Sequence, residues 1–251
     1  MGEKFPSAFA SASVNMRYLY IKDNEPTSLA CIFEPSDGEI VFYVCPGARH
    51  IPASHLPDDY VASAKIIFLT GHMMTQDETT CQTLLAAVKM ARQCETKVVF
   101  DPGKYWLNTA LESYVFEVVS MADIVLPNQS EAQLLTNCTT PSDSARSLLD
   151  MGAGQVAITL GKEGCLASSS EGIYACRGGI PDVKSALGAG DAFTSGFLHG
   201  SLQQLPLVEM AHFANATAAI KIQTAGPQQG LPDAESVLTY LNQHPPRTSV
   251  I

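Results

Sequence analysis

The segment at positions 188–193 reads Gly-Ala-Gly-Asp-Ala-Phe, and an apolar helical pattern runs from Ala192 through Gly200. Its two glycines allow a sharp turn and a close approach of the backbone to a ligand. The first turn of the following helix presents unpaired N–H groups and the positive end of the helix dipole at the same corner. These features favour an anion-binding site, and phosphate is the most obvious anion.

A single carboxylate, that of Asp191, lies at this corner. Because phosphate repels it, Asp191 is poorly placed to bind a phosphate but well placed to take a proton from a hydroxyl group that attacks one. Taken alone, the segment favours a simpler interpretation, a glycine-rich turn in which Asp191 caps a helix. The order of the other segments along the chain favours the functional interpretation.

The composition indicates one acidic globular domain. The chain has 251 residues, of which 46% are hydrophobic, so it can bury a substantial core. Its formal net charge of −10 argues against a nucleic-acid partner and against binding to an anionic membrane. An anionic substrate therefore needs a local positive site, such as a helix N-terminus.

The cysteine pattern favours a cytoplasmic protein. Seven cysteines are scattered along the chain without a C-x-x-C pair, as expected for reduced thiols rather than for disulfides or a zinc site. Residues 1–30 lack the pattern of a secretory signal, and no apolar run approaches membrane-spanning length. We therefore expect a cytoplasmic location and no membrane partner.

Residues about 17–46 predict a small β lid. Extended apolar runs at 18–21, 28–33 and 39–44 accompany an Asp-Gly pair at positions 37–38, which is a strong hairpin signal. Because these runs are not interleaved with helices, we expect them to form a separate small sheet.

After residue 57 the pattern alternates between strands and helices. Strands are predicted at 65–70, 97–100, 124–126 and 155–160, and hairpin-like segments follow a turn at 161–164 and end at Cys176. Helices are predicted at 77–93, 107–120, 131–135, 142–151, 192–200, 207–223 and 234–242. Such alternation implies a mainly parallel sheet with helices on both faces. We therefore predict a single α/β domain over residues 1–251 that carries the small β lid.

Ligands of such sheets bind beyond the carboxyl ends of the strands. The polar or glycine positions that fall there are Gly71, His72, Asp101, Asn128, Glu131, Thr159 and Gly161. Together with the turn at Gly188, five separate segments should converge on one cleft.

The ordered set of segments resembles the PfkB, or ribokinase-like, family of carbohydrate and nucleoside kinases. Residues 188–193 resemble its signature near the C-terminus, and Asn-Gln-Ser-Glu at 128–131 matches its N-x-x-E element. Thr-Leu-Gly-Lys-Glu-Gly at 159–164 resembles its nucleotide-side turn, and Asn-Ala-Thr-Ala at 215–218 resembles the helix that lines its adenine pocket. Pro-Thr-Ser at 26–28, followed by the hairpin, resembles its lid.

This resemblance implies an ATP-dependent kinase that uses Mg²⁺ and phosphorylates a hydroxymethyl group of a sugar or nucleoside. Asp191 would be the general base, beside an anion hole that the backbone amides of Ala189, Gly190 and Asp191 form at the turn of Gly188. Glu131, with Asn128, would organise Mg²⁺ and the phosphates. The residues expected to border the nucleotide are Asn128, Thr159, Gly161, Gly164 and Asn215.

Each of these residues also has a structural interpretation. Asn128 could merely cap a helix, with Glu131 closing a capping box. Thr159 and Gly161 are more often strand-end residues than ligand contacts, and Asn215 is more often a polar residue on a helix surface. We expect structural roles for Lys104 and Trp106, and His72 is a weak candidate for the acceptor pocket.

Two departures from the family pattern stand out. Members begin with a strand, a Gly-Gly turn and an Asn-bearing helix, none of which is visible here, so we expect an exposed sheet edge where those strands would pair. Many members carry Asp-Thr-Thr or Asp-Thr-Leu before the signature, where the Asp is linked to a monovalent-cation site. Ser-Ala-Leu at 185–187 lacks this carboxylate, which puts K⁺ activation in doubt.

Two functions from different classes follow. The first is a kinase for a sugar or nucleoside, with Asp191 as its base. The second is a catalytically silent relative that binds nucleotide, or only a partner, and serves regulation or assembly. A lid sheet with a free edge could also pair with a second copy, which makes a homodimer through the lid a further expectation.

Overall fold

A seven-stranded sheet forms the centre of the molecule in the computed structural model, which describes residues 4–33, 41–45, 47–48, 50–75, 77–104, 110–179 and 181–251. Four parallel strands come first: β3 (Ile66–Thr70), β4 (Lys97–Asp101), β5 (Ile124–Val125) and β6 (Gln155–Thr159). The sheet continues as an antiparallel meander of β7 (Cys165–Ser169), β8 (Gly172–Arg177) and β9 (Arg247–Val250). The strands lie in sequence order from β3 to β9.

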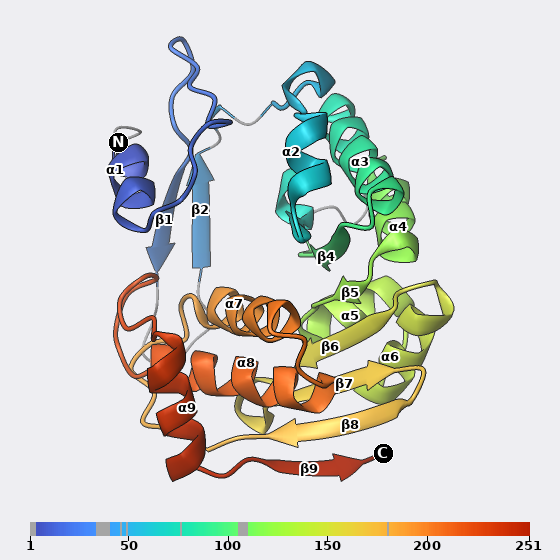
Figure 1. Ribbon diagram of the computed structural model, residues 1–251, viewed down its shortest axis with the longest axis vertical. Helices are drawn as coiled ribbons and strands as arrows, with labels where there is room; N and C mark the ends of the chain where they lie inside the picture. The colour runs from blue at the N-terminus through green and yellow to red at the C-terminus, as the bar shows by residue number, and fades with distance from the viewer. Residues whose placement is uncertain are drawn as a thin grey trace.

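Helices cover both faces of this sheet (Figure 1). One face packs against α3 (Glu78–Gln93), α4 (Glu112–Met121), α5 (Gln129–Thr136) and α6 (Pro141–Asp150). The other face packs against α7 (Ala189–Leu202) and α8 (Leu207–Lys221), and α9 (Ala234–Gln243) packs onto α8. The predicted α/β fold is confirmed. The strand-end residues of the predicted site lie at the carboxyl ends of its parallel strands, β3 to β6.

The alternation along β4 shows why both faces are buried. Val98 and Phe100 belong to the core under α3 and α4, whereas Val99 belongs to the core under α7 and α8. All three side chains are fully buried. Successive side chains of a strand point to opposite faces, so a continuous apolar run fits a strand covered on both sides.

Helix starts follow the capping signals of the sequence. Asp77 caps α3, because its Oδ1 accepts a hydrogen bond from the Thr80 N–H at 2.8 Å. The Thr140 side chain caps α6 in the same way, with Pro141 in the first turn. The predicted helix at 107–120 is described only from Glu112 onward as α4, and its first residues lie outside the described ranges, as does Trp106.

The small sheet consists of β1 (Leu29–Phe33) and β2 (Val41–Cys45), which pair antiparallel with Phe33 opposite Val41. Figure 1 shows it in blue, standing away from the seven-stranded sheet. The Asp-Gly turn predicted at 37–38 lies outside the described residues. The lid strands themselves are confirmed as a separate two-stranded sheet.

The prediction of an extended strand at 18–21 is wrong. These residues form no strand; instead the Tyr18 ring lies 4.8 Å from that of Tyr60, and the Tyr20 ring stacks 4.1 Å from that of His55. The alternating aromatic pattern therefore serves ring packing against α2 (Asp58–Ser63) and the 3₁₀ turn before it (Ala53–His55), rather than a sheet.

Three elements were not predicted: α1 (Lys4–Ser11), α2 and β9. Strand β9 is exposed along its whole length and pairs only with β8 among the described strands, so its sequence carries little apolar signal. At the opposite edge of the sheet, β3 has no outer neighbour among the described strands, and Phe68 on it is 42% exposed. Within the described residues, none of the helices is both long and apolar enough to cross a membrane.

Candidate active site

The turn before α7 depends on Gly188, which adopts a left-handed conformation with φ of 80° and occupies the N-cap position. A Cβ atom built there would lie 2.5 Å from the carbonyl oxygen of Pro227. Glycine is therefore required both by the backbone angle and by the close approach of the loop after α8. The sharp turn expected from the sequence is present.

Two backbone amides point out of this turn without a partner. The Ala189 amide donates to the Ala186 carbonyl at 3.1 Å, whereas the Gly190 and Asp191 amides find no acceptor among the described residues. A Cβ built on Gly190 would meet nothing within 4 Å. Of the three amides expected to form an anion hole, those of Gly190 and Asp191 are therefore the two without a partner among the described residues, and the space beside Gly190 is open.

Asp191 lies in the first turn of α7 and is exposed. Its carboxylate takes part in no hydrogen bond or ion pair with the described part of the chain. It does not cap α7, because the N-cap is Gly188 and no side chain caps this helix. The simpler interpretation of Asp191 as a helix cap is therefore wrong, and its carboxylate is available for chemistry.

Asp101, at the carboxyl end of β4, faces the same region. Burial raises the pKa of its carboxyl group, the Gly103 N–H that donates to its Oδ1 at 3.1 Å lowers it, and the charges of His72 and Asp191 act in opposite directions. The electrostatic influence of both neighbours indicates that β3, β4 and the start of α7 bring these groups together.

Glu131 is the most strongly perturbed carboxyl group of the cluster. Burial, with a smaller contribution from the negative charge of Asp101, raises its pKa to about 7, although the hydrogen bond from the Asn128 N–H and the positive charge of Lys104 act to lower it. Its side chain is 9% exposed. A buried acid at a sheet edge, beside a second acid, is a recurrent feature of functional sites.

Asn128 and Glu131 form a complete capping box at the start of α5. The Glu131 N–H donates to Asn128 Oδ1 at 2.9 Å, and the Asn128 N–H donates to Glu131 Oε2 at 2.8 Å. The structural interpretation of this pair is therefore confirmed. It does not compete with a binding role, because the cap fixes both side chains at the carboxyl end of β5.

The residues expected to border the nucleotide lie along the next strands. Thr159 ends β6, bridges to Asn128, and donates its N–H to the Pro127 carbonyl at 3.0 Å. Gly161 begins a short 3₁₀ turn, and a Cβ there would meet nothing within 4 Å. Gly161 therefore leaves its backbone accessible at this edge of the sheet, whereas the Thr159 amide is already paired.

Gly164 and Asn215 have structural tasks. A Cβ on Gly164 would lie 2.3 Å from the Cys176 carbonyl oxygen, and Asn215 Nδ2 donates to that oxygen at 2.9 Å. Glycine at 164 thus allows close packing against β8, and the Asn215 amide ties α8 to β8. A small crevice of about 10 Å³ beside Asn215 is bordered by Gly178, Gly179 and Tyr240.

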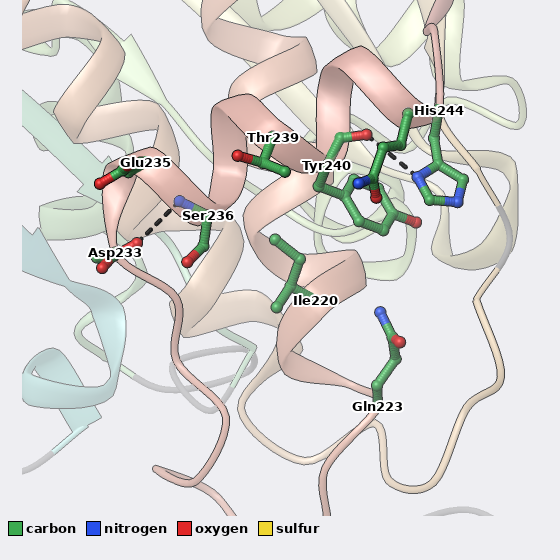
Figure 2. A pocket seen from close by; sticks show the side chains of 9 residues that line it. Ile220, Gln223, Asp233, Glu235, Ser236, Thr239, Tyr240 and His244 are labelled. Atoms are coloured by element: carbon green, nitrogen blue, oxygen red, sulfur yellow. Dashed lines mark hydrogen bonds between the residues drawn. The ribbon is translucent and has the colours of Figure 1, made fainter.

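Two larger cavities lie away from these residues. One, of about 540 Å³, is lined by Ile220 and Gln223 from the end of α8 and the residue stretch after it, and by side chains between Asp233 and His244 (Figure 2). Its two carboxylates disfavour a phosphate ligand. The other, of about 550 Å³, runs beside β3 and is lined by aromatic rings that include Tyr20, Tyr60 and Phe68.

Sequence reasoning underrated three residues. Asp101 was noted at a strand end but was given no role, and Lys104 was assigned a structural one although its charge acts on Glu131. The available signal was the position of Asp101 at the end of β4 and of Lys104 three residues later. Lys221, a fully buried lysine behind Gly188, had no signal in the sequence because it continues an ordinary helical pattern.

The profile of the pfkB family carbohydrate kinases matches residues 1–234 of the chain. The chain belongs to this family. It is similar to the ribokinase of Haemophilus influenzae, with 26% identity over 96% of this chain and 78% of the ribokinase. It is also similar to the nucleoside kinase of Methanothermobacter thermautotrophicus, with 27% identity over 96% of this chain and 75% of that kinase.

The fold is that of the ribokinase-like proteins. A crystal structure of an Escherichia coli protein named as a ribokinase II, in complex with ATP and Mg²⁺, has a TM-score of 0.86. The match covers 97% of this chain and 80% of that one, at 19% sequence identity. At this identity the likeness shows the shared fold, and the pfkB family membership shows kinship with sugar and nucleoside kinases.

Proposed function

We propose that this pfkB family member transfers the γ-phosphate of ATP to a hydroxymethyl group of a sugar or nucleoside. The observation that carries the proposal is the start of α7, where the exposed Asp191 carboxylate lies beside the unpaired Gly190 and Asp191 amides. Phosphoryl transfer depends chiefly on positioning and on electrostatic stabilisation, and this corner offers both.

Asp191 acts as the general base. Its carboxylate takes the proton of the acceptor hydroxyl as the acceptor oxygen bonds to the γ-phosphorus, while the bond from that phosphorus to the β–γ bridging oxygen breaks and ADP leaves. The Gly190 and Asp191 amides donate hydrogen bonds to the oxygens of the transferring group. The α7 dipole adds a positive potential at the same point.

The acidic cluster fits a Mg²⁺–nucleotide. Mg²⁺ takes oxygen ligands, commonly one or two carboxylates together with phosphates and water, and would neutralise charge on the phosphates when bound. Glu131 supplies a carboxyl group, with Asn128 and Asp101 beside it. Among the described residues no group of three His, Cys, Asp or Glu side chains converges as a metal site, so the protein itself offers one or two ligands here.

The nucleotide is assigned to the edge that runs from Asn128 through Thr159 and Gly161 toward Asn215. Support comes from the bridge that joins Asn128 to Thr159 and from the open space above Gly161. Gly164 and Asn215 shape this edge through their contacts with β8. His72, whose charge acts on Asp101, is placed on the acceptor side of the cluster.

The small sheet is assigned to the acceptor side as a lid and as a homodimer contact. Its strands expose several large apolar side chains, and an exposed flat edge is a template for pairing with another chain. These side chains are Leu29, Ile32, Phe33, Val41, Tyr43 and Val44. Sedimentation equilibrium should show a dimer, and a monomer at high micromolar concentration would contradict this assignment.

A cytoplasmic location suits the seven free cysteines.

ADP formation over a panel of pentoses, hexoses, sugar phosphates and nucleosides, with Mg²⁺ and ATP, tests the proposal. We expect acceptor-dependent ADP release for at least one compound. The alternative, a catalytically silent relative that serves regulation or assembly, predicts nucleotide binding or partner binding with no turnover for any member of the panel. A protein that binds nucleotide and turns over no acceptor would therefore favour the alternative.

A further inference from the structure

Lys221, the last residue of α8, carries a buried positive charge close to the candidate active site. Its exposed fraction is 0%. Its Nζ donates hydrogen bonds to the carbonyl oxygens of Gly226 at 2.6 Å and Thr224 at 3.4 Å. The ion pairs within the described ranges do not include it. Because a buried ammonium group needs polar partners in place of water, these carbonyls serve as its ligands.

The Lys221 side chain lies directly behind the turn of α7. A Cβ atom on Gly188 would be 3.3 Å from Lys221 Cε and 2.5 Å from the Pro227 carbonyl oxygen. The chain before the turn is tied to the same place, since the backbone amides of Lys184 and Ser185 both donate to the Ile222 carbonyl, at 2.9 Å and 3.2 Å. The loop that accepts hydrogen bonds from the Lys221 ammonium group therefore also packs directly against the turn at Gly188.

Carbonyl oxygens that converge on one point are a typical binding arrangement for a monovalent cation such as K⁺. Here an ammonium group, which carries the same single charge, meets two such oxygens while remaining attached to the helix. Ser185 holds no charge and uses its hydroxyl oxygen to accept the Leu187 N–H at 3.2 Å. The positive charge beside these carbonyl oxygens is thus supplied by the Lys221 side chain of the chain itself.

We propose that Lys221 is a positioning residue that acts as a tethered monovalent cation. Its ammonium group draws the carbonyls of residues 224 and 226 together behind Gly188, and this holds the Gly190 and Asp191 amides in their outward orientation. The kinase should therefore be independent of added K⁺. The effect on turnover rests on the proposed function, whereas the effect on the loop does not.

Melting temperatures in chloride salts of N-methylglucamine, Na⁺, K⁺ and NH₄⁺ at constant ionic strength test the tether. Lys221→Ala leaves space for an ion, Lys221→Met fills the space without charge, and Lys65→Ala is a control that removes an exposed charge from β3's start. We expect the wild type and the control to melt at the same temperature in all four salts. Lys221→Ala should melt lower and recover saturably with K⁺ or NH₄⁺, and Lys221→Met should melt lower without recovery.

Turnover supplies a second readout. Lys221→Met should lower kcat about tenfold or more with little change in the acceptor KM, since a displaced amide pair affects the transferring group rather than the acceptor. The proposal is overturned if the wild type shows saturable activation or stabilisation by K⁺, or if Lys221→Ala melts like the wild type. A Lys221→Ala protein that stays unfolded in K⁺ and NH₄⁺ also overturns it, because a tethered cation should be replaceable. The melting series needs no turnover, so it decides the matter even if the acceptor panel yields no substrate.

Discussion

The central sheet and the small lid sheet differ in how far they bury their apolar side chains. Phe100 on β4 is fully buried between helices, whereas Phe33 on β1 is 58% exposed and has only the Tyr43 ring, 5.6 Å away, as its aromatic neighbour among the described residues. The central sheet therefore buries its apolar side chains within the chain itself, and Asp101, Glu131 and the turn at Gly188 lie at the ends of its strands. The small sheet leaves apolar side chains exposed, and an exposed apolar patch of this kind is typical of a contact surface.

The largest expected difference between the two sheets is in stability. Phe100→Ala should lower the free energy of unfolding by about 3–5 kcal/mol, because it removes a buried ring and leaves a cavity. Phe33→Ala should lower it by less than about 1 kcal/mol, because that ring is already largely in water. Urea denaturation of both variants measures the contrast. Equal losses would show that the lid is packed as firmly as the central sheet.

The next contrast lies within one turn of the central body. Gly188→Ala should cost about 2–3 kcal/mol, because it adds a Cβ at a positive φ and against the Pro227 carbonyl. Gly190→Ala should leave the melting temperature unchanged, yet it should lower kcat about 10-fold to 100-fold, since its methyl group enters the space assigned to phosphate.

Calorimetry and ADP release on the same two preparations measure both effects. A Gly190→Ala protein with wild-type turnover would show that the transferring phosphate does not lie beside Gly190. A Gly188→Ala protein with wild-type stability would show that the turn is less constrained than its contacts imply.

A smaller effect is expected from Glu131, whose pKa is raised from 4.5 to about 7 by burial. Between these two values the folded protein holds a proton that the unfolded chain has released, so stability should fall as pH rises through this window. The loss should be on the order of 2 kcal/mol between pH 5 and pH 8. Glu131→Gln keeps the capping box and should flatten that part of the profile. An unchanged profile in the variant would assign the pH dependence to another group.

The sequence predicted the parts of this molecule that rest on local chemistry. The turn at Gly188, the capping box of Asn128 and Glu131, and the alternation of strands and helices all follow from residues a few positions apart, and the structure contains each of them. The helices predicted at 77–93 and 142–151 likewise begin within one residue of their expected positions, at Glu78 and Pro141.

Features that depend on contacts between residues far apart in the chain could not be predicted from the sequence. The residues at 18–21 look like a strand until Tyr60 and His55 are placed beside them. The exposed strand β9 shows no apolar pattern and is defined only by its pairing with β8. Lys221 looks like any helix-ending lysine until the loop that follows it folds back behind Gly188.

The central claim is that Asp191 is the base of a phosphoryl transfer beside two backbone amides. Its most direct test is Asp191→Asn, with Asp150→Asn as a matched control on an exposed helix end. We predict that Asp191→Asn lowers kcat by about 10²-fold to 10⁴-fold while the Kd for ATP, measured by titration calorimetry, stays near the wild-type value. The control should match the wild type in both. Wild-type turnover in Asp191→Asn, or a loss of ATP binding parallel to the loss of turnover, would contradict the account.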